Sequence, residues 1–231
     1  MQNAERADKP QCVPRHCCIY FKPMSTAETA RWVLDILFGY FLGGVLFSWH
    51  IPKLLKNIDI CDLSDDHNPG TTNAMIFAGR RIASLCLFCD LLKGFLPVFF
   101  AVRWLNTESW LFAVVMAAPV LGHATAPFYK LSGGKSIAVS FGVLLALFPT
   151  SFSVVILAFF YILFSTAIKI TPVRVRSILT FAVSGAVSLA VCLWQGLFAM
   201  GLGCAVISGI VIVKHLKRFS AETDLSREKA M

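Results

Sequence analysis

The sequence predicts an all-α integral membrane protein, a bundle of seven transmembrane helices of which one is unusually short. Two observations carry this prediction. Hydrophobic residues make up 57% of the 231 residues and charged residues only 15%, whereas soluble domains carry about 25% charged residues. The apolar runs are also long enough to cross a bilayer, which takes about 20 residues in a helix. Together these features favour one membrane domain over several soluble ones.

The apolar runs place the expected helices in order along the chain. A polar tail is expected at residues 1–30, a membrane domain at 31–213 and a polar C-terminal tail at 214–231. The run Ile137–Ile168 is too long for one crossing, and Pro149 is expected to divide it into a short helix and a fuller one. The expected spans are Arg31–Pro52, Ile82–Trp104, Trp110–Tyr129, two within Ile137–Ile168, Ser177–Trp194 and Gly196–Val213, with a hydrophilic loop over Lys53–Arg81.

The basic residues predict how the bundle is oriented. The formal net charge is +8, and most Lys and Arg residues fall in the Lys53–Arg81 loop, in the later loops on the same side and in the C-terminal tail. Because cytoplasmic loops carry an excess of Lys and Arg, we expect the N-terminus outside and the C-terminus in the cytoplasm. Orientation explains this charge without a nucleic-acid partner.

The eight cysteines do not suggest a disulfide framework. Cys86 and Cys89 form a C-x-x-C, but they lie in an apolar run among Leu and Phe, where a thiol behaves as a small hydrophobic group. Cys12, Cys17 and Cys18 lie in the polar N-terminal tail beside a histidine. A metal or lipid attachment there stays open, although an incidental cluster is the simpler interpretation.

Asp90 and Lys93 are the two charges inside a predicted span. They are three residues apart and therefore share one face of a helix. Charges at membrane depth are costly and usually face a partner or a wet cavity. The pair could line a polar site, or it could be a structural ion pair near the helix end.

Three further elements fall on the predicted cytoplasmic side and suggest an anion site. The loop Asn68–Asn73 is dense in turn residues, and its glycine lets backbone N–H groups approach a ligand. Gly133-Gly134-Lys135 precedes an apolar helix, whose N-terminus attracts phosphate. His123 lies near the cytoplasmic end of the preceding span and could be a base, a phosphate ligand or a buried structural histidine. Each signal is weak alone, but together they favour binding of a phosphate-bearing molecule.

The order of these motifs resembles the acyl-phosphate:glycerol-3-phosphate acyltransferase family (PlsY). Its first motif follows a Gly-Ser in the opening span, where this chain has Phe41-Leu42-Gly43-Gly44. Its second, G-S-G-N-x-G-A-T-N, is matched in its latter part by Asn68–Asn73. Asp90–Gly94 matches a recurrent family segment. The third motif is matched by Gly122-His123, Phe128 and Ser132–Ala138, and the resemblance covers roughly residues 32–218.

The resemblance implies a seven-helix enzyme that transfers a fatty acyl group from acyl phosphate to glycerol 3-phosphate. The product is lysophosphatidate, an intermediate of phospholipid synthesis, and the family needs no cofactor and no metal. Acyl phosphate is already activated, so holding two anionic reactants together and stabilising charge would be enough. By resemblance His123 and Lys135 would be catalytic, and the phosphate would be bound by Asn68, Gly70, Thr72, Asn73, Gly133, Gly134 and Lys135.

The chain also departs from the family pattern. Gly44 replaces a serine, Asp65-Asp66-His67 replaces G-S-G with one extra residue, and Ile76 replaces an arginine, although Arg80 lies one turn further on. We therefore expect Arg80, with Asp90 and Lys93, as possible lining of the site, and weaker binding of glycerol 3-phosphate. A divergent member with another acceptor or no activity is an alternative. An anion transporter or channel lined by Asp90 and Lys93 is another.

Overall fold

The computed structural model describes residues 24–129 and 133–228, with side chains described up to residue 216. Every regular element in these ranges is helical, which confirms the predicted all-α class. In chain order the elements are α1 (Thr26–Gly44), α2 (Phe47–Lys56), α3 (Ile60–Leu63), α4 (Thr71–Ala78), α5 (Arg80–Trp104), α6 (Leu111–Thr125), α7 (Ile137–Ala146), α8 (Ser153–Ile162), the π-helix η1 (Leu163–Ala167), α9 (Val173–Trp194) and α10 (Phe198–Glu228).

The first predicted span is two helices rather than one. The Ser25 hydroxyl caps α1 by accepting a hydrogen bond from the Glu28 N–H, and the Glu28 carboxylate accepts one from the Ser25 N–H, so the helix starts earlier than the apolar run. It ends at Gly44, because Val45 is extended, and α2 then leaves at an angle of 44° to α1. The bend matters for the site because it leaves the Val45 carbonyl, inside the bundle, free of the helix and able to accept a hydrogen bond from another segment.

Helix lengths support membrane spanning for part of the bundle. Among the described residues, α5, α9 and the segment Phe198–Leu216 are long and apolar enough to cross a membrane, and α1 with α2 adds a fourth if the bent pair is one span. The shorter apolar helices are α6, α7 and α8 with η1. The predicted break at Pro149 separates α7 from α8, while the count of seven spans stays a prediction.

The last helix continues beyond the end of the predicted last span. The last span was expected to end at Val213, but α10 continues without a break to Glu228. The polar residues after Val213 therefore begin as an extension of the same helix.

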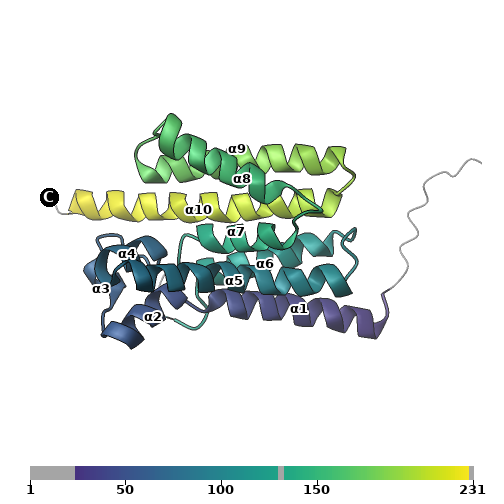
Figure 1. Cartoon of the computed structure of the whole chain (residues 1–231), viewed down its shortest axis with the longest axis horizontal. Helices are drawn as coiled ribbons and strands as arrows, with labels where there is room; N and C mark the ends of the chain where they lie inside the picture. Colours follow the sequence, from purple (N-terminus) through teal and green to yellow (C-terminus); the bar gives the residue numbers. More distant parts are fainter. Residues whose placement is uncertain (1–23, 130–132, 229–231) are drawn as a thin grey trace, which may run out of the picture.

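The helices lie side by side in a bundle with one additional cap (Figure 1). The largest contacts pair α9 with α10, α1 with α6, α5 with α7 and α6 with α10. One core joins them, with Val98, Phe112, Met116, Phe181 and Ile207 among its buried members. The short helices α2, α3 and α4 form a cap at the end where α10 finishes (Figure 1).

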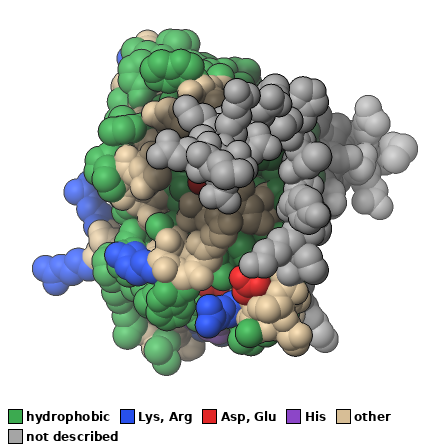
Figure 2. All heavy atoms as spheres, turned by 90° about the vertical axis from the view of Figure 1, so that its right-hand side faces the viewer, with side chains coloured by type: hydrophobic (Ala, Val, Ile, Leu, Met, Phe, Trp, Pro, Cys, Tyr) green, Lys and Arg blue, Asp and Glu red, His purple; other side chains and the backbone are tan. Residues whose placement is uncertain are grey.

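The outer surface of the bundle is consistent with a lipid environment. Viewed from the end where α1 begins, hydrophobic side chains cover much of the described flank (Figure 2). Large apolar side chains that are more than half exposed include Leu34, Phe88, Phe159 and Ile162. In water such a surface would favour aggregation, whereas in a bilayer it is the expected lipid contact.

Reciprocal glycines bring α5 and α7 close together. A side-chain carbon at Gly142 would overlap the backbone carbonyl of Leu91, and one at Gly94 would overlap that of Val139. Small residues at such contacts let the backbones of membrane helices approach each other. The closeness of α5 and α7 therefore depends on the absence of side chains at these two positions.

We predict that Gly142→Ala destabilises the bundle, because the added methyl group has to push α5 and α7 apart. Overfilling a packed contact typically costs about 1–3 kcal/mol. Thermal unfolding of the purified protein in detergent measures the effect. The control is Gly209→Ala, since a side-chain carbon there meets no atom within 4 Å and should leave the unfolding temperature unchanged or slightly higher. Equal unfolding temperatures for the two variants would contradict the close approach.

Candidate active site

A buried ion pair lies beneath the site, where α5 meets the junction of α1 and α2. The Lys93 Nζ lies 2.8 Å from Asp90 Oδ1, and the two side chains are 0% and 3% exposed. Ser48 donates a hydrogen bond of 2.6 Å to the other oxygen of Asp90. Both charges are buried and face each other, so Asp90 and Lys93 form an ion pair, which lies near the middle of α5 and not near its end. Asp90 also lines the site cavity, and a role of either residue in the function stays a prediction.

The Lys93 ammonium group ties three segments of the chain together. It donates to the Val45 carbonyl at the bend between α1 and α2, and it lies 2.9 Å from Nδ1 of His123 on α6. A protonated lysine can only donate, so Nδ1 of His123 must accept. The neutral imidazole then carries its proton on Nε2, which makes this nitrogen a hydrogen-bond donor.

The polar loop before α4 is held to this network and to itself. Asn68 and Asn73 are both buried, and the Asn73 side chain donates to the Asn68 carbonyl at 2.9 Å. Thr71, the first residue of α4, lies 3.3 Å from the Ser48 hydroxyl, which in turn contacts Asp90. The loop is therefore fixed to α2 and α5 through one chain of hydroxyl contacts.

The Gly133-Gly134-Lys135 segment packs directly against the end of α6. The Gly134 N–H donates to the His123 carbonyl at 3.0 Å. A side-chain carbon at Gly134 would overlap the His123 ring, and Gly133 adopts a positive φ of 58° beside the Ala124 carbonyl. Only glycine fits both positions without strain. This packing places Lys135 immediately before α7, as the sequence predicts.

Lys135 forms an ion pair across the site with Asp66. Its Nζ lies 2.8 Å from Asp66 Oδ2, and both side chains are about one-third exposed. The other Asp66 oxygen accepts from the Asn73 side chain at 2.8 Å and from the Asn68 N–H at 3.2 Å. Burial would raise the pKa of Asp66, but the hydrogen bonds from Lys135 and Asn73 and the charge of Lys135 outweigh it and hold the pKa below its usual value. Asp66 is therefore an anion at neutral pH.

These elements surround a cavity of about 520 Å³ with two chemically different parts. One part is polar and comes from the loop, α4, α5 and α6. The other is an apolar wall formed by α5, α7 and α8. The polar lining is Asn68, Gly70, Thr71, Thr72, Asp90, His123, Lys135 and Ser136, and the apolar lining includes Leu87, Leu91, Ile137, Phe141, Leu145 and Val154, with Tyr161 beside them.

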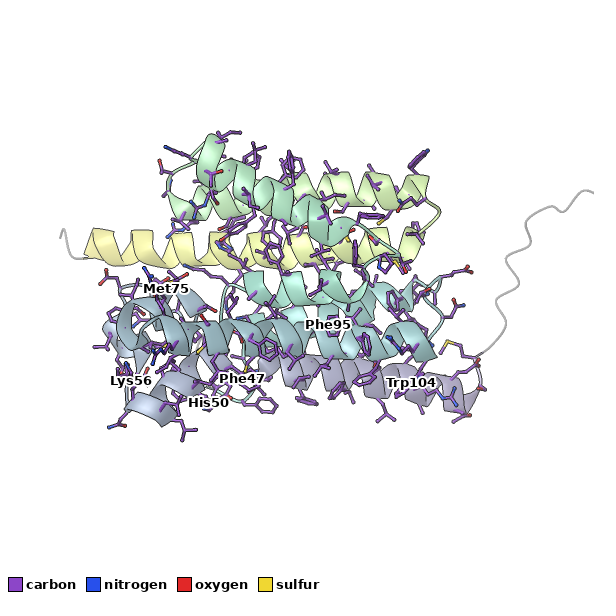
Figure 3. The ribbon with its side chains drawn as sticks, viewed as in Figure 1. Phe47, His50, Lys56, Met75, Phe95 and Trp104 are labelled. Carbon is purple, nitrogen blue, oxygen red and sulfur yellow. The ribbon has the colours of Figure 1, made fainter. Side chains whose placement is uncertain are left out.

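Figure 3 locates the cavity along the bundle. Met75, which belongs to the cavity lining, lies at the end of the molecule capped by α2 to α4, and Trp104 lies toward the opposite end (Figure 3). The helix α5 joins the two ends over 25 residues, about 37 Å at 1.5 Å per residue. The cavity therefore reaches the capped end at Met75, while Asp90, which also lines it, lies near the middle of α5 (Figure 3).

The structure brings most of the sequence-predicted residues together. Asn68, Gly70, Thr72, His123 and Lys135 line the cavity. Asp90, expected as possible lining, also lines it. The other predicted residues of the described part lie outside the lining. Asn73, Lys93, Gly133 and Gly134 are buried behind it, and Arg80 is exposed at the start of α5.

Ser48, Thr71 and Ser136 were not predicted as site residues from the sequence. Thr71 and Ser136 were inside quoted motifs, and their place in the cavity lining depends on how the helices begin. Ser48 had a weaker signal: it is a hydroxyl residue four positions after Gly44, where the family's serine is missing. A side-chain carbon at Gly44 would lie 2.8 Å from Pro127, so this position leaves no room for the serine.

Comparison with known proteins gives one consistent result. The family model described as glycerol-3-phosphate acyltransferase matches residues 33–222. Glycerol-3-phosphate acyltransferase from Lacticaseibacillus casei is 33% identical over 187 residues, 81% of this chain and 86% of that protein. Glycerol-3-phosphate acyltransferase 2 from Thermotoga maritima is 40% identical over 120 residues, 52% of this chain, and the match spans only 60% of that protein.

Solved structures agree with the sequence matches. The crystal structure of PlsY (YgiH), an integral membrane glycerol 3-phosphate acyltransferase, in its glycerol 3-phosphate form has a TM-score of 0.69 at 26% identity and covers 84% of this chain and 92% of PlsY. Its lysophosphatidic acid form gives a TM-score of 0.68 at 25% identity. The chain therefore belongs to the glycerol-3-phosphate acyltransferase family and, like the integral membrane protein PlsY, is embedded in a membrane by its apolar helices.

Proposed function

We propose that the protein is a membrane acyltransferase that moves a fatty acyl group from acyl phosphate to glycerol 3-phosphate and releases lysophosphatidate. The observation that carries this proposal is the two-part cavity. Its polar end offers an ammonium group, an imidazole and hydroxyl groups, and it continues into an apolar wall between α5, α7 and α8. A molecule with a phosphate at one end and a fatty chain at the other fits both parts.

The chemistry needs few groups from the protein. The glycerol hydroxyl oxygen bonds to the acyl carbon, the bond from that carbon to the phosphate oxygen breaks, and inorganic phosphate leaves with the electron pair. The hydroxyl proton passes to the departing phosphate. Positioning and charge stabilisation are then the main contributions of the site, which fits a cavity whose lining includes several hydrogen-bond donors.

Individual residues have separate tasks in this proposal. Lys135 neutralises phosphate charge, and Thr72, which lines the same cavity, adds a hydroxyl donor. His123 donates from Nε2–H, because its Nδ1 already accepts from Lys93. Asn68 Oδ1 is buried and has no hydrogen-bond partner among the described residues, so it is available to accept from a substrate hydroxyl. A base role for His123 is less suitable, since the nitrogen that could reach substrate already carries the proton.

The departures from the family pattern concern the acceptor. Ile76 is 66% exposed and, among the described residues, lies outside the cavity lining. At this position the chain therefore lacks the side chain of the arginine that follows the family's second motif. We infer that glycerol 3-phosphate binds more weakly than in typical family members, or that a related phosphorylated polyol takes its place.

We also propose that the site faces the cytoplasm of a bacterial cell. The capped end holds α2, which carries Lys53 and Lys56, and the start of α5, which carries Arg80 and Arg81, whereas Arg103 precedes Trp104 at the other end of α5 (Figure 3). An excess of Lys and Arg marks the cytoplasmic side. The anionic substrates would then be taken from the cytoplasm and the product left in the membrane.

The first prediction concerns Lys135. Lys135→Ala removes a charged hydrogen-bond donor worth roughly 1.5–3 kcal/mol, which corresponds to about a 10- to 150-fold slower acyl transfer if the contact is made in the transition state. The assay uses the purified protein with acyl phosphate and glycerol 3-phosphate. Lys56→Ala is the control, because Lys56 is exposed on the same cap and outside the cavity lining. Similar rates of acyl transfer in both variants would show that Lys135 does not contribute to the reaction.

The second prediction separates a donor from a base at His123. His123→Ala should slow the reaction about 100-fold, the typical effect of losing one donor to a developing negative charge. His123→Gln should recover a measurable part of the rate, because the amide of glutamine still donates. A proton-accepting role predicts the opposite, namely that both variants are equally slow. Thermal unfolding confirms that both variants are folded.

The third prediction tests orientation. Cys61 is only 3% exposed, so we place the label on its exposed neighbour with Asp62→Cys, and at the other end of α5 with Glu108→Cys. Both are made after Cys12, Cys17 and Cys18, which lie outside the described residues, are replaced by serine. In intact cells an impermeant maleimide should label the cysteine at 108, and the cysteine at 62 only after permeabilisation. The reverse pattern would show that the site faces outward.

A further inference from the structure

We propose that Asp66 is an internal competitor for the phosphate site, so that an anionic substrate has to displace its carboxylate from Lys135 before it binds. The inference rests on the proposed phosphate site and adds a specificity-determining residue to it. Lys135 lines the cavity, yet its ammonium group is bound to Asp66 at 2.8 Å. The cation best suited to a phosphate is therefore occupied by an anion of the same chain.

The surroundings of Asp66 resemble those of a bound anion. Its two oxygens are held by the Lys135 ammonium, the Asn73 amide and the Asn68 backbone N–H. An oxyanion site provides such a set of hydrogen-bond donors, here an ammonium group, a side-chain amide and a backbone N–H. All three belong to the segments that the sequence analysis assigned to phosphate. The carboxylate thus occupies donors that the substrate would use.

Geometry allows this carboxylate to leave. Asp66 lies on a loop between α3 and α4 rather than within a helix, and its side chain is 28% exposed. Water can therefore solvate it after displacement. The Asp90–Lys93 pair is different, because both of its side chains are buried in the bundle and separation would strand two charges without water. Of these two ion pairs, only Asp66–Lys135 is suited to exchange with a ligand.

Competition of this kind selects for charge. A carboxylate carries one negative charge, whereas a phosphate monoester near neutral pH carries between one and two. A dianionic phosphate gains more from the Lys135 ammonium than Asp66 does and can replace it. A ligand with a single carboxylate gains no advantage over Asp66. The site should therefore discriminate against monoanions more strongly than an otherwise identical site without this residue.

The test measures binding without turnover. Inorganic phosphate and glycerol 3-phosphate are titrated against the full-length protein in detergent, and dissociation constants are obtained from the shift in unfolding temperature. Asp66→Asn keeps the shape but removes the competing charge, and we expect about fivefold tighter binding of both probes. Asp65→Asn is the matched control: it removes the same charge one residue away, from an exposed side chain, and should change affinity less than about twofold.

Comparing Lys135→Ala with the double variant Asp66→Asn/Lys135→Ala shows whether the change in phosphate affinity depends on Lys135. The gain in phosphate affinity from Asp66→Asn should vanish when Lys135→Ala is also present, because the ammonium group for which Asp66 and phosphate compete is then missing. A persistent gain would indicate general electrostatics and overturn the proposal. Weaker phosphate binding in Asp66→Asn would overturn it as well, since Asp66 would then position Lys135 for the ligand. The unfolding temperature without ligand verifies that each variant is folded.

The outcomes also separate this inference from the proposed reaction. Tighter phosphate binding in Asp66→Asn together with no acyl transfer in any variant would support the competitor and contradict the acyltransferase function. If acyl transfer occurs and the KM for glycerol 3-phosphate is equal in Asp66→Asn and Asp65→Asn, the acyltransferase function is supported and competition by Asp66 is contradicted. A lower KM in Asp66→Asn alone would support both.

Discussion

The buried contact between Asp90 and Lys93 is the interaction on which the site depends. Removing a charge pair from water costs several kcal/mol per ion, and the attraction between the partners offsets this only when their remaining hydrogen-bonding groups are satisfied. Here Ser48 binds the carboxylate, while Val45 and His123 bind the ammonium. Each of these partners comes from a different segment, so the charges can stay buried only if the bend after α1, the start of α2, and α6 keep their places on α5.

This requirement extends from the buried pair to the surface of the cavity. His123 is held by Lys93 on one side, and its ring and carbonyl receive Gly134 on the other. Gly134 precedes Lys135, so the position of the surface cation follows from a contact between backbone and ring rather than from the lysine itself. The close approach of α5 and α7 adds the apolar wall beside it. Polar and apolar parts of the cavity are thus fixed by the same few helix contacts.

Features that depend on local pattern, such as helix positions and breaks, could be predicted from the sequence. Features that depend on contacts between distant residues could not. Apolar runs located α5 within two residues, and Pro149 located the break before α8, because hydropathy and proline act locally. The spacing of Asp90 and Lys93 likewise placed them on one face. The bend at Val45 could not be predicted, since it is stabilised by a lysine 48 positions away. The contact between Asp66 and Lys135 spans 69 positions and had no local signal.

Two ion pairs with similar distances therefore have different consequences. Both measure 2.8 Å from nitrogen to oxygen, but distance alone does not set their strength. A partly exposed pair contributes about 0–1 kcal/mol, because water solvates the separated charges nearly as well. A buried pair that loses one partner costs about 3–5 kcal/mol. The first value is small enough for a phosphate to exchange with a carboxylate at Lys135, and the second keeps Lys93 in place beneath it. Burial, rather than residue type, decides which lysine holds the fold and which one is available to a ligand.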